Sequence, residues 1–127
     1  MSDNEINLRE NVRQQSNFIY NVLEHLDYKS MEIFETMLLA DNIQVILADE
    51  EMVKTAKCFF DNNLNITIAA KKLYMHRNTL VYRLEKMKKI LGLDIKEFDD
   101  AITLKILITL YDIKRNKDYN KNINCVL

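Results

Sequence analysis

Glycine and proline are almost absent from this chain: Gly92 is its single glycine, and it has no proline. These residues usually mark the tight turns that join β-strands, so their scarcity argues against strands connected by hairpins. A hydrophobic fraction of 48% suffices for a packed core, and 127 residues is the length of one domain, or of one domain with an appendage. The sequence therefore predicts an all-α fold of several helices.

Residues 67–92 indicate a short helix, a tight turn at 74–76 and a longer helix over 77–91. Gly92 follows the last apolar residue of the longer helix, where a left-handed C-terminal cap requires glycine. An apolar stripe runs along that helix at i, i+4, i+7 and i+11: Leu80, Leu84, Met87 and Leu91. Its other side is basic and able to form hydrogen bonds. Such a pair is typical of a DNA-binding helix-turn-helix, although an amphipathic hairpin with a solvated lysine face has the same periodicity.

The most specific stretch is HRNTLVYRL, residues 76–84, preceded by Asn65-Ile66-Thr67 and Ala69-Ala70. These residues resemble the C-terminal helix-turn-helix of the PucR / sugar-diacid-regulator (CdaR-like) family of bacterial transcription factors, which is related to the Fis-type helix-turn-helix. The resemblance covers about residues 49–110, roughly half the chain. One departure from the general pattern is Tyr74, where many relatives have glycine. The resemblance implies a transcriptional regulator, or its DNA-binding part, that binds double-stranded DNA sequence-specifically.

On this interpretation, the helix over 77–91 lies in the major groove. Arginine suits guanine and asparagine suits adenine, so base reading is assigned to residues near its N-terminal end: Arg77, Asn78, Val81 and Tyr82. Phosphate contacts are assigned to residues on the flanks of the motif: Lys71, Lys72, His76, Thr79, Arg83 and Lys86. Arg83 lies nearer the apolar stripe than the others, so an internal acidic partner is the alternative for it.

Charge is unevenly distributed behind the net value of −1. Residues 1–51 contain three Lys/Arg and eleven Asp/Glu, whereas residues 67–91 contain seven Lys/Arg and a single acid, Glu85. The expected helix-turn-helix is thus basic, whereas the N-terminal part of the chain is acidic. The basic region would attract DNA phosphates without regard to sequence. Pairing of these charges within the fold is the alternative.

Residues 2–26 are expected to form a first helix, with Ser2 and Glu5 as a candidate capping box. Its stripe is heptad-like with one polar member: Leu8, Val12, Gln15, Ile19, Val22 and Leu26. This seam suits either a homodimer or packing on the same chain. Because helix-turn-helix proteins usually bind DNA as symmetric pairs, we expect a homodimer, with the seam slightly favoured over the last helix as its interface.

Three other helices are expected around the motif. Ser30 caps the first of these helices. Its buried face is expected to hold Ile33, Phe34, Met37 and Leu38. Residues 42–47, which follow it, are expected to form either a helical turn or an extended connector.

Asp49 caps the second helix, over 50–62, which is expected to pack behind the motif. Its core face consists of Met52, Val53, Ala56, Phe59 and Phe60. Asn65 then caps the short helix of the motif. The third runs from about 97 to 114, apolar on all sides except Lys105, Thr109 and Asp112.

The expected organisation is an N-terminal helical extension over residues 1–48, a DNA-binding domain over 49–115 and a polar tail over 116–127. No enzyme, cofactor or metal site is expected: His25 and His76 lack ligand partners at i+3 or i+4, and one glycine cannot build a phosphate loop. No apolar run could span a membrane, no signal peptide is evident, and Cys58 and Cys125 fit no motif. A cytoplasmic protein is therefore expected. The alternative function is a non-DNA dimerisation or protein-interaction module derived from a helix-turn-helix.

Overall fold

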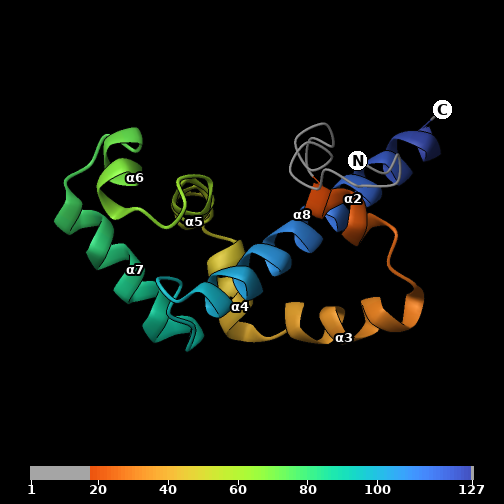
Figure 1. Ribbon diagram of the computed structural model, residues 1–127. Coiled ribbons are helices and arrows are strands. Elements are labelled where there is room, and N and C mark those ends of the chain that lie inside the picture. The colour runs from red at the N-terminus through yellow and green to blue at the C-terminus, as the bar shows by residue number, and fades with distance from the viewer. Residues whose placement is uncertain (1–17, 127) are drawn as a thin grey trace, which may run out of the picture.

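Seven helices account for most of residues 18–126, the part of the chain described in this computed structural model, with side chains at 19–27 and 29–116. No strand occurs within these residues, so the predicted all-α class is confirmed. In chain order the helices are α2 (Phe18–Glu24), α3 (Tyr28–Leu38), α4 (Asp41–Leu47), α5 (Glu50–Asp61), α6 (Ile66–Lys72), α7 (Arg77–Leu91) and α8 (Phe98–Val126) (Figure 1). Three residues of the expected seam, Leu8, Val12 and Gln15, and the candidate capping box lie outside the described residues.

Figure 1 shows α6 and α7 at one end of the molecule and α2 at the other. The long helix α8 runs between these ends, above α4, and contacts α2, α3 and α5. Helix α4 contacts both α5 and α7, and α5 contacts α6, α7 and α8. No helix among the described residues is long and apolar enough to cross a membrane.

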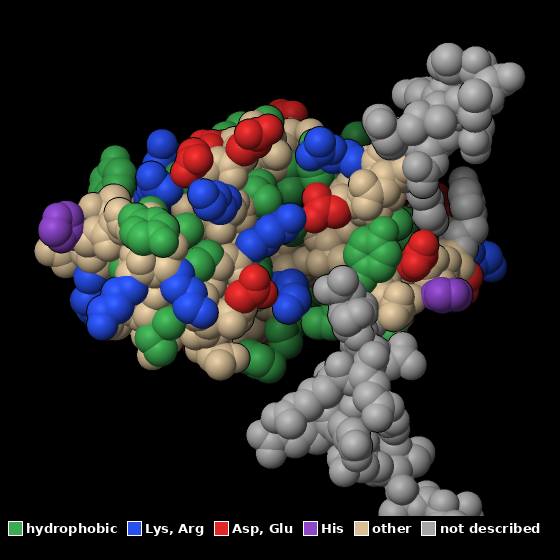
Figure 2. Space-filling model, turned by 90° about the horizontal axis from the view of Figure 1, so that it is seen from above, with side chains coloured by type: hydrophobic (Ala, Val, Ile, Leu, Met, Phe, Trp, Pro, Cys, Tyr) green, Lys and Arg blue, Asp and Glu red, His purple; other side chains and the backbone are tan. Residues whose placement is uncertain are grey.

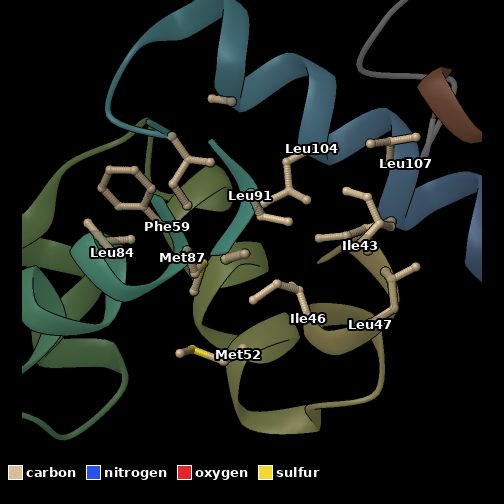
Figure 3. Close-up of a cluster of buried hydrophobic side chains, with 14 of the residues drawn as sticks. Ile43, Ile46, Leu47, Met52, Phe59, Leu84, Met87, Leu91, Leu104 and Leu107 are labelled. Atoms are coloured by element: carbon tan, nitrogen blue, oxygen red, sulfur yellow. The ribbon is translucent and has the colours of Figure 1, made fainter. Parts of the chain in front are cut away.

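The core gathers apolar side chains from α4, α5, α7 and α8 (Figure 3). Phe59 of α5, Leu84 and Met87 of α7, and Ile46 of α4 belong to this one cluster. All four of these side chains are buried. Removal of such apolar surface from water is the main favourable term in folding, so this cluster fixes α7 against the rest of the chain.

The helix ends confirm several expectations. Asp49 caps α5 by accepting from the amide of Met52 at 3.2 Å, and Asn65 caps α6 by accepting from the amide of Ile68 at 2.9 Å. Helix α7 ends at Gly92, whose φ of 73° is left-handed. The Gly92 amide donates to the carbonyl of Lys88 at 2.8 Å, which is the expected C-terminal cap.

The N-terminal part departs from the expectations in two ways. Helix α3 is capped by Asp27, not Ser30: Asp27 is extended, and its carboxylate accepts from the Ser30 amide at 2.8 Å. Ile33 and Met37 were expected to be buried but are 67% and 41% exposed, because α3 meets the core through Leu38 and half-buried Phe34 instead. Residues 42–47, for which two structures were considered, are helical in α4.

Helix α8 is longer than predicted. It was expected to end near residue 114, but its backbone stays helical to Val126. The segment after 114 contains neither glycine nor proline, so nothing in its sequence breaks the helix. Polarity alone was a poor indicator of the helix end: lysine and arginine are good helix formers, and asparagine lowers the helix propensity of this segment without the strong penalty of proline.

Candidate nucleic-acid interface

Helices α6 and α7 pack against each other across a tight turn. Ala69 and Ala70 of α6 are buried, and their small side chains allow close approach of the two helices. In the turn, the amides of Tyr74 and Met75 donate to the carbonyls of Lys71 and Ala70 at 3.1 and 3.0 Å. Tyr74 adopts a left-handed backbone with φ 54°, the conformation that suits glycine, and its side chain is 97% exposed. The geometry is that of a helix-turn-helix.

Helix α7 has one buried and one exposed face. The predicted stripe of Leu80, Leu84, Met87 and Leu91 is buried throughout. Of the base-reading candidates, Arg77 and Asn78 are exposed, Tyr82 is 68% exposed and Val81 is half-buried. Their spacing of one turn, 77 with 81 and 78 with 82, brings the four side chains onto the N-terminal half of the exposed side.

The phosphate candidates surround that surface, with one exception. Five of them are exposed: Lys71, Lys72, His76, Thr79 and Lys86. Arg83 is half-buried and directed to α5, where its Nη1 donates to Thr55 Oγ1 at 3.0 Å and lies 3.7 Å from a Glu51 carboxylate oxygen. The structure thus places Arg83 on internal partners, the alternative raised by its sequence position.

The N-terminus of α7 is open to an anion. His76 is its N-cap, with extended backbone and no side-chain hydrogen bond to the helix, and the first turn contains no acid. The first amides of a helix lack intrahelical acceptors, and the helix dipole places partial positive charge there. A DNA phosphate is an anion that such an end accommodates.

Acidic groups near α7 are paired away from this end. Glu85 accepts from Lys96 at 2.9 Å, which lowers the pKa of the Glu85 carboxyl, and Lys88 lies 3.6 Å from Asp94. Among the described residues, no ion pair engages Lys71, Lys72, Arg77 or Lys86. Figure 2 shows Lys and Arg side chains gathered at the α6–α7 end, at the left of the view. The cations of this end are therefore available to a phosphate backbone.

Comparison with known proteins agrees with this geometry. Residues 52–110 match the PucR C-terminal helix-turn-helix domain family. This stretch, just under half of the chain, is called the PucR-type domain below, after the family that it matches. No solved structure matches the chain significantly.

Three longer proteins contain a segment that is similar to part of this chain. An uncharacterized protein of Bacillus subtilis is 41% identical over 71 residues, 56% of this chain and 24% of the relative. The purine catabolism regulatory protein of B. subtilis is 32% identical over 62 residues, 49% of this chain and 12% of the relative. The carbohydrate diacid regulator of Escherichia coli is 37% identical over 57 residues, 45% of this chain and 15% of the relative. This chain thus spans a quarter or less of each of these proteins.

Relatives that share the PucR-type domain are named as a purine catabolism regulatory protein and as a DNA-binding transcriptional activator. The exposed candidate residues of α6 and α7 belong to the motif that was visible in the sequence. Thr55, the partner of Arg83, was missed there. One signal could have found it: Thr55 lies between Met52 and Phe59 in the apolar stripe of α5, where a hydroxyl needs a partner.

Proposed function

We propose that this chain acts as a sequence-specific DNA-binding transcriptional regulator, or as the DNA-binding part of one, with α7 in the major groove. The observation that carries the proposal is the exposed N-terminal half of α7, with Arg77 outside any ion pair of the described residues, within a PucR-type domain. The proposed role needs no catalytic group and no cofactor, and a partner on bacterial chromosomal DNA implies a cytoplasmic location.

Base reading is proposed for four side chains of α7. The Arg77 guanidinium fits O6 and N7 of guanine, and the Asn78 amide fits N6 and N7 of adenine, each through two hydrogen bonds. Val81 would contact a thymine methyl group, and the Tyr82 hydroxyl extends the hydrogen-bonding edge. Their exposure and one-turn spacing support this assignment.

Phosphate contacts are proposed for Lys71, Lys72, His76, Thr79 and Lys86. These side chains are exposed and flank the reading surface on both helices of the motif. Contacts of this kind position a protein on the duplex but carry no sequence information. They should therefore contribute equally on any duplex.

A homodimer is proposed as the working unit, because one recognition helix reads too few base pairs for discrimination within a genome. Burial within the chain favours the N-terminal seam as interface. Leu104, Leu107, Leu110 and Ile113 of α8 are buried, so the last helix is used internally, whereas Ile19 and Val22 of α2 are exposed. A two-fold pair would place its recognition helices about 34 Å apart, or a multiple of that spacing, on a palindromic site.

Selection of bound sequences from a random duplex pool tests the proposal. We expect enrichment of one palindromic sequence and a steep loss of affinity with salt. Lys72→Ala and Lys86→Ala should each weaken binding to all duplexes and reduce the salt slope by about one unit. Lys114→Ala on α8, also at an exposed lysine, is the matched control and should leave the slope unchanged. A protein-interaction module would instead give no enriched sequence and no difference among these variants.

A further inference from the structure

Thr55 is the one buried polar side chain among the described residues, and it belongs to α5, which packs against α7. Its Oγ1 donates to the carbonyl oxygen of Glu51, one turn earlier, at 2.7 Å. The same Oγ1 accepts from Arg83 Nη1 at 3.0 Å. The hydroxyl therefore donates within its own helix and accepts from the recognition helix. Both of its bonds are made, as a buried hydroxyl requires.

The Glu51 carboxylate forms a second, weaker contact with Arg83, an ion pair. Its oxygen lies 3.7 Å from Nη1, and its side chain is largely exposed. An exposed ion pair at this distance contributes little and is screened by salt. The directional contact between α5 and α7 is thus the one from Arg83 to Thr55.

We propose that Thr55 and Arg83 set the rotation of α7 about its own axis, and thereby aim Arg77 and Asn78 at the bases. Arg83 is then a positioning residue, not a phosphate contact. This inference deepens the proposed function and rests on it.

Packing of aliphatic side chains leaves some freedom in the rotation of a helix. The buried stripe of α7 consists of three leucines and one methionine, whose unbranched, flexible side chain adapts to small shifts. A hydrogen bond adds a directional restraint, because it favours donor–hydrogen–acceptor angles above about 150° and weakens steeply below about 120°. Groups that recognise a ligand must be held within roughly 10–20° of their working orientation. A buried hydrogen bond at the α5–α7 interface supplies that restriction.

Placement of Arg83 also argues against a phosphate role. Its side chain is 29% exposed, whereas Lys86, one turn further along α7, is exposed. The Nη1 donor of Arg83 would have to leave Thr55 to reach a phosphate. Its departure would leave the buried hydroxyl with an unmet acceptor, which costs free energy.

The test uses the full chain and two duplexes of equal length, one recovered by selection and one of random sequence. Thr55→Val removes the hydroxyl without changing charge, Thr55→Ser retains it, and Arg83→Lys and Arg83→Met alter the partner. Thr109→Val on α8 is the matched control, because the Thr109 hydroxyl makes the same kind of bond, to Lys105 at 2.7 Å. Affinity is measured for both duplexes over a range of salt, below the melting temperature of every variant.

We expect Thr55→Val and Arg83→Lys to reduce the ratio of specific to random affinity about tenfold, the equivalent of one hydrogen bond to a charged group. Random-duplex affinity and the salt slope should stay unchanged, since no phosphate contact is lost. Thr55→Ser should restore the ratio, and Thr109→Val should not affect it. Thr55→Val should have no further effect in an Arg83→Met background, because both changes remove one contact.

Three results would overturn the inference and leave the proposed function standing, provided that the wild-type chain discriminates between the duplexes. The first is a Thr55→Val variant that discriminates as well as the wild-type chain, and the second is an Arg83→Met variant whose salt slope falls by about one unit. The third is a Thr55→Val variant whose affinity falls alike for both duplexes, as a merely structural role of Thr55 would cause. Equal affinity of the wild-type chain for both duplexes would overturn the proposed function and this inference with it.

Discussion

The Lys96 ammonium donates to the Glu85 carboxylate at 2.9 Å, linking the third turn of α7 to the segment that joins α7 and α8. Glu85 is the single acid of α7, and its pairing with Lys96 means that it does not compete with a phosphate for the other cations nearby. The contact also leaves a measurable sign in the titration of both groups, because each ion favours the charged form of the other.

Replacement of Lys96 by methionine should raise the pKa of Glu85 toward its ordinary value of 4.5, since the Lys96 hydrogen bond is the main cause of its lowered pKa. In the wild-type chain, the stability contributed by Glu85 is present above its unfolded pKa and is lost as pH falls through its lower folded pKa. Lys96 has a raised pKa, so its contribution is present below its unfolded pKa and is lost as pH rises through the folded one.

NMR titration of the Glu85 carboxyl carbon measures this effect. Lys88→Met is the control and should move the pKa less, because Lys88 contributes less to the lowered pKa than Lys96. An unchanged Glu85 midpoint in Lys96→Met would show that the pair does not form in solution.

Substitution of Gly92 by alanine should lower the free energy of unfolding by about 1 kcal/mol, because an L-residue with a Cβ is strained at a φ of 73°. The Cβ itself would meet nothing within 4 Å, so the loss arises from the backbone and not from a clash. Urea unfolding measures it. Gly92→Asn is the control, because asparagine tolerates the left-handed region better, and a loss as large as that of alanine would contradict the explanation.

Replacement of Tyr74 by glycine should raise the free energy of unfolding, whereas replacement of Gly92 by alanine should lower it. Tyr74→Gly relieves a left-handed tyrosine whose side chain is 97% exposed, so we expect a gain of roughly 0.5 kcal/mol after the greater freedom of glycine in the unfolded chain is included. The midpoint of urea unfolding should rise. Tyr82→Gly, an exposed tyrosine within α7, should instead lower it, because glycine is a poor residue inside a helix.

Asn78→Ala should cost roughly 1–3 kcal/mol on the selected duplex and relax the preference at one base pair. Asn78 is exposed, so the fold should be unaffected. Repeating the selection with the variant measures the preference directly. If every base position kept its original preference, Asn78 would not be a base-reading residue.

Val22→Asp should convert a dimer into a monomer of 15.1 kDa in sedimentation equilibrium at micromolar concentration. Val22 is 49% exposed in the isolated chain, so a carboxylate there is tolerated by the monomer but not by an apolar interface. Ile33→Asp on α3 is the matched control, since Ile33 is exposed as well and lies outside the seam. A wild-type chain that sediments as a monomer would contradict the dimer hypothesis.

Local signals explain why α7, its C-terminal cap and the N-terminal cap of α6 were predictable from the sequence. Gly92 caps α7 through its own backbone, Asn65 caps α6 through its side chain, and the stripe from Leu80 to Leu91 needs only the helical period. The exposure of Arg77, Asn78 and Tyr82 followed from the motif in residues 76–84, because these side chains belong to one helix. Features that depend on two helices were less accessible.

Ile33 and Thr55 illustrate the limit. Ile33 fits a buried stripe by its spacing, but it is exposed because α3 packs against α8 through another side. The sequence of α3 alone does not show which side packs against α8. The bond between Thr55 and Arg83 joins residues 28 positions apart. An internal partner for Arg83 could be inferred from its position on α7, whereas the identity of that partner required the packing of α5 on α7.

Helix α8 has a consequence for how the chain holds together. It contacts α5, which supports the recognition helix, and it contacts α2 and α3 at the other end of the molecule. The PucR-type domain ends at residue 110, yet α8 continues beyond it without interruption. The N-terminal helices and the helix-turn-helix are consequently connected through one continuous helix, α8. Melting of α2 and α3 would therefore uncover the apolar side of α8 and weaken the support of α5 behind α7.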